Sequence, residues 1–313
     1  MASPPRVLMI RLGAMGDIIH AMPAALSLHS IEPGSEIHWA VERRWLPLLD
    51  GCPEWTPVVI DRNAILQSVK QLRKVRYDLV VDFQGLLKSA ILARTAHAHR
   101  VAGYAGSQCR EPMASWFYSD RFSSPSTHIA ERHLDLAQAA GARRRDVRFP
   151  LPEGSAEGDL PKGRYVLANP LAGWRAKQWP LDRYALLAKR LRDELDLAFV
   201  VNVARGTSID LPYIPVHASG LPGLIHATRR ATAVVGLDSG PMHLAAALGV
   251  PGVALFGPTD PARNGPVGGS FTVLRDPLAV TSYKRRDEWD ASLLALGVDQ
   301  VFEALRDRLR GKT

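Results

Sequence analysis

The sequence predicts an α/β fold made of two doubly wound domains. Short runs of Val, Ile and Leu alternate with stretches whose apolar residues recur at helical spacing. Continuous apolar runs are typical of strands buried on both faces of a parallel sheet, and their alternation with helices indicates βαβ units. One segment rich in Pro, Gly and acidic residues, 150–163, interrupts the series and is the best candidate linker.

The first half of the chain supplies one complete series of elements. We expect its strands at residues 7–12, 36–41, 57–60, 78–83 and 100–104, and its helices at 18–29, 64–75, 86–97 and 129–140. On these bounds Asp17 stands at the N-cap of the first helix, where an aspartate is favoured.

The second half repeats the pattern. We expect strands at 165–169, 197–203, 233–238, 252–257 and 271–275, and helices at 182–195, 222–230, 241–248 and 298–310. The predicted domains are residues 1–155 and 156–313, and the final helix is able to pack back on the first domain. Because ligands of such folds bind at the carboxyl ends of the strands, we expect a ligand site in a cleft between the two domains.

Composition narrows the class of protein. The chain has 313 residues, of which 46% are hydrophobic and 22% charged, as in globular proteins. No apolar run approaches the roughly 20 residues that span a bilayer, and the N-terminus lacks a signal-peptide pattern, so we expect a cytoplasmic protein. Cys52 and Cys109 lack the spacing of a metal site and are expected to be thiols.

The charge balance indicates an anionic partner. The formal net charge is +8, and basic residues cluster at 70–76, 143–148 and 284–286. Each cluster alone is more typical of a solvated face. Since no nucleic-acid-binding motif accompanies them, we expect no nucleic acid partner. Acidic lipid headgroups and a phosphorylated substrate remain as candidates.

The loop "RLGAMGD" (11–17) follows the first strand and looks at first like a phosphate cradle. Its G-x-x-G-D spacing is not the dinucleotide fingerprint, and no phosphate-binding lysine follows. A carboxylate inside the loop would also repel a phosphate. We therefore expect Asp17 to serve either as a helix cap or in chemistry.

The stretch "GLDSGPMHL" (236–244) is the better candidate for an anion site. A strand ends at Asp238, Ser239 and Gly240 form a turn, and Pro241 takes the first helical position. The free amides of a helix N-terminus and its dipole attract anions, and His243 can face the same ligand. The alternative is an ordinary turn with a capping serine, but the combination of residues favours a ligand site.

Two further loops carry cations at strand ends. Lys177 and Arg175 precede the helix expected at 182, where a cation could reach a diphosphate or simply face solvent. Trp179 is expected to pack the loop. Lys88, Arg110 and Arg121 could meet an acidic acceptor, or be surface charges.

Together these motifs resemble one family, the ADP-heptose:lipopolysaccharide heptosyltransferases of glycosyltransferase family nine. The similar stretches are, in order along the chain, "VLMIRLGAMGDIIHAMPA", "YDLVVDFQGLLKSA", "REPMASWFY", "KQWP" and "LDSGPMHLAAALGVPGVALFGPTDP". The resemblance implies a GT-B architecture, in which the first Rossmann-like domain holds the acceptor and the second holds the nucleotide sugar. It also implies an inverting transfer that requires no metal and no cofactor besides the donor.

The resemblance implies roles for particular residues. Asp17 is the expected general base, and Lys177 is expected to bind the donor phosphates and assist catalysis. The expected donor site also contains Gly173, Ser219, Asp238, Ser239, Gly240 and His243. The expected acceptor site contains Gly16, Lys88 and Arg110. The expected partners are a nucleotide sugar, a lipopolysaccharide precursor and, peripherally, the anionic inner-membrane surface.

The sequence departs from the family at 202–215, where a glycine-rich loop and a helix usually contact the nucleotide. Asp210 is the one candidate there for a ribose-binding acid. Two alternatives therefore stay open. One is a GT-B enzyme that uses another nucleotide sugar or acceptor, and the other is a protein that binds a nucleotide sugar or anionic glycan without catalysis.

Overall fold

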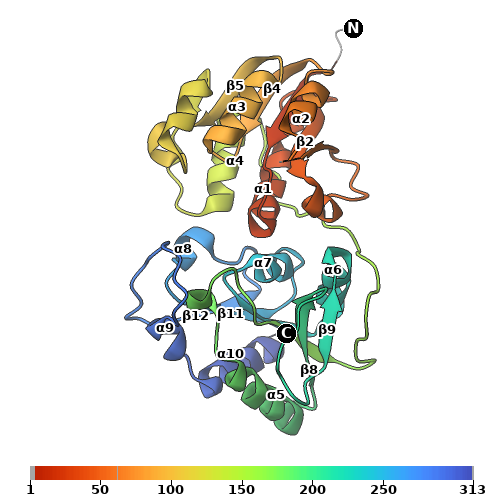
Figure 1. Cartoon of the computed structure of the whole chain (residues 1–313), viewed down its shortest axis with the longest axis vertical. Coiled ribbons are helices and arrows are strands. Elements are labelled where there is room, and N and C mark those ends of the chain that lie inside the picture. The colour runs from red at the N-terminus through yellow and green to blue at the C-terminus, as the bar shows by residue number, and fades with distance from the viewer. Residues whose placement is uncertain (1–3, 62, 312–313) are drawn as a thin grey trace. The chain divides into compact units, whose positions relative to one another are not determined.

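The chain folds into two compact units that meet in sequence after Pro152 (Figure 1). The computed structural model describes residues 4–61 and 63–311. Unit 1 here denotes the described residues up to Pro152, and unit 2 those from Glu153 onward.

Unit 1 is a doubly wound α/β domain. Among its described residues, six parallel strands form one sheet in the order β3-β2-β1-β4-β5-β6. The strands are β1 (Arg6–Ile10), β2 (Glu36–Glu42), β3 (Thr56–Ile60), β4 (Tyr77–Asp82), β5 (Ala98–Tyr104) and β6 (Asp120–Phe122). The helices are α1 (Met15–Leu28), α2 (Ile65–Leu72), α3 (Leu87–Thr95) and α4 (Ile129–Ala140), with 3-10 turns η1 (Arg43–Leu48), η2 (Gly106–Gln108) and η3 (Pro112–Phe117).

The start of α1 corrects one expectation, that Asp17 is the N-cap. The helix begins at Met15 with Ala14 as its N-cap, so Asp17 is the third helical residue. Its Oδ2 accepts a hydrogen bond from the Ala14 amide at 3.1 Å. An acidic residue accepts hydrogen bonds from free amides of the first turn both at the N-cap and at the third helical position. The sequence alone therefore does not tell these two positions apart.

Unit 2 has the same architecture. Its described residues form a second sheet of six parallel strands in the order β12-β11-β10-β7-β8-β9. The strands are β7 (Tyr165–Asn169), β8 (Ala198–Ala204), β9 (Val216–Ser219), β10 (Ala233–Leu237), β11 (Gly252–Phe256) and β12 (Phe271–Arg275). The helices are α5 (Leu181–Leu195), α6 (Leu221–Arg230), α7 (Gly240–Ala247), α8 (Pro261–Asn264), α9 (Ala291–Leu294) and α10 (Val298–Arg310), with a 3-10 turn η4 (Arg175–Lys177).

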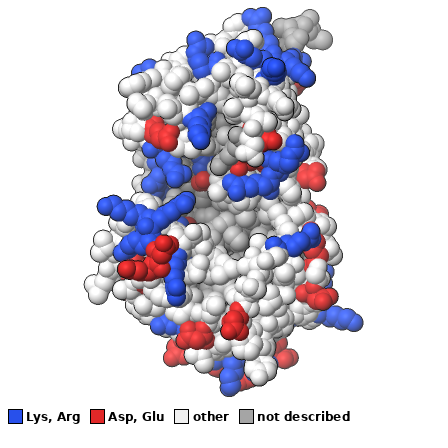
Figure 2. Space-filling view, viewed as in Figure 1, with Lys and Arg blue, Asp and Glu red and all other residues white. Residues whose placement is uncertain are grey.

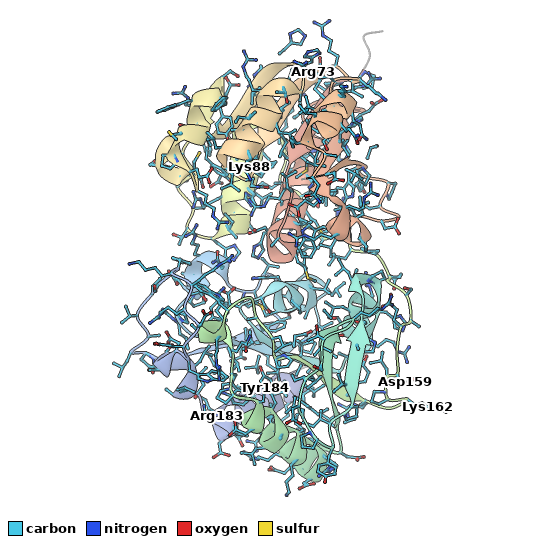
Figure 3. The ribbon with its side chains drawn as sticks, in the orientation of Figure 1. Arg73, Lys88, Asp159, Lys162, Arg183 and Tyr184 are labelled. Carbon is cyan, nitrogen blue, oxygen red and sulfur yellow. The ribbon has the colours of Figure 1, made fainter. Side chains whose placement is uncertain are left out.

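The core of unit 2 lies between its sheet and the helices α5 and α10. Alternate strand residues such as Val166 and Val235 meet Leu187 of α5 and Phe302 of α10. Trp179 is fully buried and its indole nitrogen donates to the carbonyl of Leu296 at 2.9 Å, which confirms that it packs the loop. Its ring meets that of Tyr184, labelled on α5 in Figure 3, edge to face at 5.0 Å.

The expected linker is irregular in structure, but part of it is fixed to unit 2. Glu157 accepts a hydrogen bond from the Gly220 amide at 2.6 Å through its side chain, and its backbone carbonyl lies 2.5 Å from Nε2 of His217. The segment around Glu157 therefore packs along the β9 edge of the unit 2 sheet.

In each sheet the strand order reverses between two central strands. In unit 1 the chain goes from β1 outward to β2 and β3 and then returns to β4 on the other side of β1. In unit 2 it goes from β7 outward to β8 and β9 and then returns to β10 on the other side of β7. The loops that leave the carboxyl ends of two such strands diverge, and ligands of doubly wound folds bind in the space between them. None of the helices in the described parts of the chain is long and apolar enough to cross a membrane.

Candidate active site

In unit 1 the loop after β1 carries Asp17 at this reversal point. The buried side chain of Arg11 donates to the carbonyl of Phe83 at 2.8 Å, and its other terminal nitrogen lies 2.7 Å from Asp17 Oδ2. The side chain of Asp17 is 39% exposed. Its Oδ1 accepts no hydrogen bond from the described residues, so one carboxylate oxygen is held while the other has no protein partner there.

The sequence did not single out Arg11. Its signal is a cation directly after the apolar run of β1, at a position that is only 7% exposed. A buried guanidinium requires partners, and here they are a backbone carbonyl of the neighbouring loop and the carboxylate of Asp17. The pair fixes where Asp17 points.

The loops that carry the expected acceptor residues lie beside this one. The amide of Leu12 donates to Gln84 at 2.9 Å, which ties the first loop to the turn before α3. The amide of Glu111 donates to the carbonyl of Gly85 at 3.0 Å, which ties the "REP" segment to the same turn. Lys88, in the first turn of α3, and Arg110, in the loop before η3, are both exposed near the carboxyl edge of the sheet. Gly16 lies in the first turn of α1.

Asp82, at the end of β4, connects these segments through hydrogen bonds. Its Oδ2 accepts from the hydroxyls of Ser89 and Tyr118, both at 2.7 Å, and its Oδ1 accepts from the amide of Gln84 at 2.8 Å. Burial raises the pKa of Asp82, although these hydrogen bonds oppose the shift. The residue is fully buried, so it organises the loops rather than contacting a ligand.

In unit 2 the reversal point holds a cluster of three charged or titratable side chains. Lys177 follows β7, and its Nζ lies 2.5 Å from Asp238 Oδ2 and 3.2 Å from the carbonyl oxygen of Asp238. Nε2 of His243, in the first turn of α7, lies 3.6 Å from Asp238 Oδ1. The structure thus brings Lys177 to Asp238 and His243, although 61 positions separate Lys177 from Asp238 in the sequence.

The cluster keeps Asp238 ionised. Burial alone would raise the pKa of this carboxyl, but the hydrogen bond from His243 and the charge of Lys177 outweigh it, and the pKa lies well below its ordinary value. Lys177 itself packs over the ring of Trp174, with Nζ 5.3 Å from the ring centroid. The ammonium group is therefore fixed rather than free to sample solvent.

Helix α7 begins beside this cluster. Ser239 is the N-cap, but its hydroxyl donates to the carbonyl of Leu237 at 3.3 Å and does not cap the helix. The helix starts at Gly240, so Pro241 is its second residue rather than its first. The serine therefore leaves the amides at this N-terminus to another acceptor, which argues against the capping alternative.

Two expected donor residues lie outside the cluster. Gly173 is exposed in the loop after β7, and nothing lies within 4 Å of where a Cβ would stand. Ser219 ends β9, the edge strand, and its hydroxyl donates to Asn202 at 3.0 Å. Strands β7 and β8 separate it from β10, a distance of about 14 Å at the usual strand spacing.

The carboxyl edge of this sheet also holds polar groups that the sequence did not single out. Neither side-chain atom of Asn169, the last residue of β7, finds a hydrogen-bond partner among residues 4–61 and 63–311, and the same holds for the Thr259 hydroxyl. Both residues are at most 3% exposed. Buried polar atoms are usually paired, so these are places where a ligand or water completes the structure.

Across the described ranges, no three or more His, Cys, Asp or Glu side chains are grouped so that they could hold a metal ion. A comparison with protein-family models matches residues 65–201 and 219–289 to glycosyltransferase family 9 (heptosyltransferase). The chain belongs to this family. It is therefore a glycosyltransferase, with a fold that the resemblance predicted correctly.

Individual relatives agree with the family model. Lipopolysaccharide heptosyltransferase 1 of Pseudomonas aeruginosa is 32% identical over 85% of this glycosyltransferase and 82% of its own length. The enzyme of the same name from Escherichia coli is 28% identical over 87% and 94%. Among solved structures, E. coli heptosyltransferase WaaC with ADP has a TM-score of 0.76 at 25% identity, covering 97% of this chain and 99% of that one.

Proposed function

We propose that this glycosyltransferase transfers heptose from ADP-heptose to the inner core of a lipopolysaccharide precursor, with inversion at the anomeric carbon. The observation that carries the proposal is the cluster of Lys177, Asp238 and His243 at the start of α7. The relatives named lipopolysaccharide heptosyltransferase support the sugar and the acceptor, and the solved structure that contains ADP supports the nucleotide.

The donor diphosphate is proposed to bind at this cluster. Breaking the sugar–phosphate bond builds negative charge on the leaving diphosphate, which the Lys177 ammonium and the amides after Ser239 would stabilise. These groups supply the charge that a divalent cation supplies elsewhere, so we expect transfer without one. The nucleotide would extend along the carboxyl edge of the sheet toward Gly173 and Ser219.

The acceptor is proposed to bind unit 1, with Asp17 as the general base. Oδ1 of Asp17 would take the proton of the attacking hydroxyl while Arg11 holds Oδ2. The hydroxyl oxygen then forms the new bond to the anomeric carbon on the face opposite the leaving diphosphate, so the configuration inverts. Gly16 would allow close approach of the acceptor, and Lys88 and Arg110 would contact its anionic groups.

A membrane contact is part of the proposal. Helix α3 packs against η3, and between them they expose Ile91, Met113 and Trp116, the last with 69% of its surface accessible. Exposed apolar and tryptophan side chains beside Lys88 and Arg110 suit the interface of an anionic bilayer. We propose that the protein works at the cytoplasmic face of the inner membrane.

The test is product formation by the purified chain. ADP-heptose and a heptose-free lipopolysaccharide acceptor should give the heptosylated product, detected by mass spectrometry, with and without EDTA. UDP- and GDP-sugars in parallel test the alternative donors. Binding of ADP-heptose without product would favour the non-catalytic alternative, and loss of product in EDTA would contradict the metal-independent route.

A further inference from the structure

A basic cavity lies at the edge of the unit 1 sheet opposite Asp17. It has a volume of about 450 Å³ and its lining includes Arg73, Lys74, Arg76, His97 and His99. The first three residues connect α2 to β4, and the two histidines lie where α3 connects to β5. Because β4 and β5 are parallel neighbours, both connections meet at the amino ends of their strands.

This cavity is separate from the proposed acceptor site. Strand β4 runs six residues, from Tyr77 to Asp82, which places the two edges of the sheet roughly 16–20 Å apart. Figure 3 labels Arg73 at the top of unit 1 and Lys88 lower down in the same unit. Figure 2 shows several Lys and Arg side chains at the end where Arg73 lies, and others lower on the same face.

The described residues that line the cavity bring positive charges and no negative ones. No carboxylate is among the described residues that line it. Asp78, two residues after Arg76, accepts the Arg6 amide at 2.9 Å, and Asp120 pairs with Arg100, the residue after His99, at 2.7 Å. Inside the cavity a terminal nitrogen of Arg76 lies 3.1 Å from His99 Nε2, so a guanidinium contacts an imidazole with no carboxylate between them.

The negative ends of two helices compensate only part of the positive charge of the cavity. Nε of Arg73 donates to the carbonyl of Thr95 at the end of α3, at 3.3 Å, and the C-terminus of α2 lies next to Arg73 in sequence. Each helix end carries about half a negative charge, whereas Arg73, Lys74 and Arg76 bring a full positive charge each. The terminal nitrogens of Arg73 remain available to an anion.

We propose that this cavity is a second anion site, which binds a phosphomonoester or diphosphate group independently of the transfer reaction. The volume lies within the range of small-molecule sites and exceeds what one inorganic phosphate needs. Arginine side chains suit such groups because their paired N–H donors match phosphate oxygens. The same chemistry could come from a free diphosphate or from a phosphorylated lipid headgroup.

The test is a titration of the full chain with inorganic diphosphate, with saturating ADP present to fill the proposed donor site. Binding should weaken at least tenfold in Arg73→Ala/Arg76→Ala and should persist in Arg73→Lys/Arg76→Lys, which keeps the charges. The matched control is Lys189→Ala/Arg192→Ala, which removes as many exposed charges from α5. Thermal unfolding of each variant checks that it is folded.

A second arm separates the two sources of phosphate. The same proteins are sedimented with phosphatidylcholine vesicles that do or do not contain phosphatidic acid. Arg73/Arg76-dependent binding to diphosphate supports a soluble ligand, and such binding to phosphatidic acid vesicles supports a lipid headgroup. The proposal is overturned if neither probe binds, or if the alanine variant and the α5 control lose binding equally. Transfer activity is measured separately, so its absence would leave this result intact.

Discussion

Asp238 shows how much one residue depends on its neighbours. It is an almost fully buried carboxylate at a strand end, and only the ammonium of Lys177 and the imidazole of His243 keep it charged there. Removing one partner of a buried pair leaves the other charge uncompensated, which costs more than the pair itself contributes. The residue therefore links the stability of unit 2 to its proposed donor site.

The pH dependence of stability follows from the sign of that shift. The pKa of Asp238 lies below its ordinary value in the folded chain, so its stabilisation is present above the unfolded pKa of about 3.9 and is lost as the pH falls through the folded pKa. We expect Asp238→Asn to lower the free energy of unfolding by about 2–4 kcal/mol at pH 7. The difference from wild type should shrink below pH 4, as measured by urea unfolding.

The control for this prediction is Asp299→Asn. That carboxylate pairs with Arg190, but its side chain is 93% exposed, so the change should be under about 1 kcal/mol. Equal losses in both variants, or a difference that does not change with pH, would contradict the role assigned to the buried pair.

At the same scale, Asp17→Asn tests the proposed base. The amide can still occupy the place of the carboxylate beside Arg11, but it cannot accept the proton of the acceptor. Turnover should fall at least about a hundredfold, while donor affinity, measured by calorimetry, stays near wild type. Asp50→Asn, an exposed change in the same unit, should leave both unchanged. Near-normal turnover of Asp17→Asn would remove Asp17 as the base.

At the scale of elements, the ring of Tyr118, directly after η3, packs closely against Gly103 of β5. A Cβ at Gly103 would stand 2.4 Å from the ring of Tyr118, whose hydroxyl donates to the buried Asp82. Gly103→Ala should displace this ring, weaken its hydrogen bond and lower the free energy of unfolding by about 1–3 kcal/mol. Gly163→Ala, where nothing lies within 4 Å, is the control. Equal stability of the two variants in urea would contradict this account.

Most elements were predictable because the interior strands are apolar throughout. The interior strand β7 was predicted to the residue. The strands that were missed, β6 and β9, lie at sheet edges and have only three and four residues. An edge strand pairs on one side alone and does not need a continuous apolar run, so its sequence resembles a loop.

The site was predictable only where one segment carries several of its groups. Asp238, Ser239 and His243 are within six residues of one another, and Lys177 was a candidate from its loop and took its expected role from the family's motif. The contacts of Arg11 with Asp17, and of Asp82 with Tyr118, depend on which strands are neighbours. No local pattern in the sequence predicts which strands lie side by side.

At the scale of the whole molecule, the net charge of +8 should govern association with anionic surfaces. We expect the protein to sediment with vesicles that contain anionic lipid and not with neutral ones. Binding should fall as NaCl rises from about 0.1 M to 1 M, because the Debye length shrinks from about 10 Å to about 3 Å. Binding that salt does not weaken would instead indicate that apolar contacts such as Trp116 dominate.

The pairing of Lys177 with Asp238 has a consequence for selectivity. In the free protein these two opposite charges cancel, so the cluster at the start of α7 shows little net charge to the many small phosphates that a cell contains. A ligand that draws the ammonium toward itself must compete with a carboxylate already bound to it. If the donor diphosphate binds here as proposed, it can compete because it also reaches His243 and the helix amides, whereas a lone phosphate would offer fewer contacts. The ion pair therefore favours ligands that make enough further contacts to compensate for separating Lys177 from Asp238.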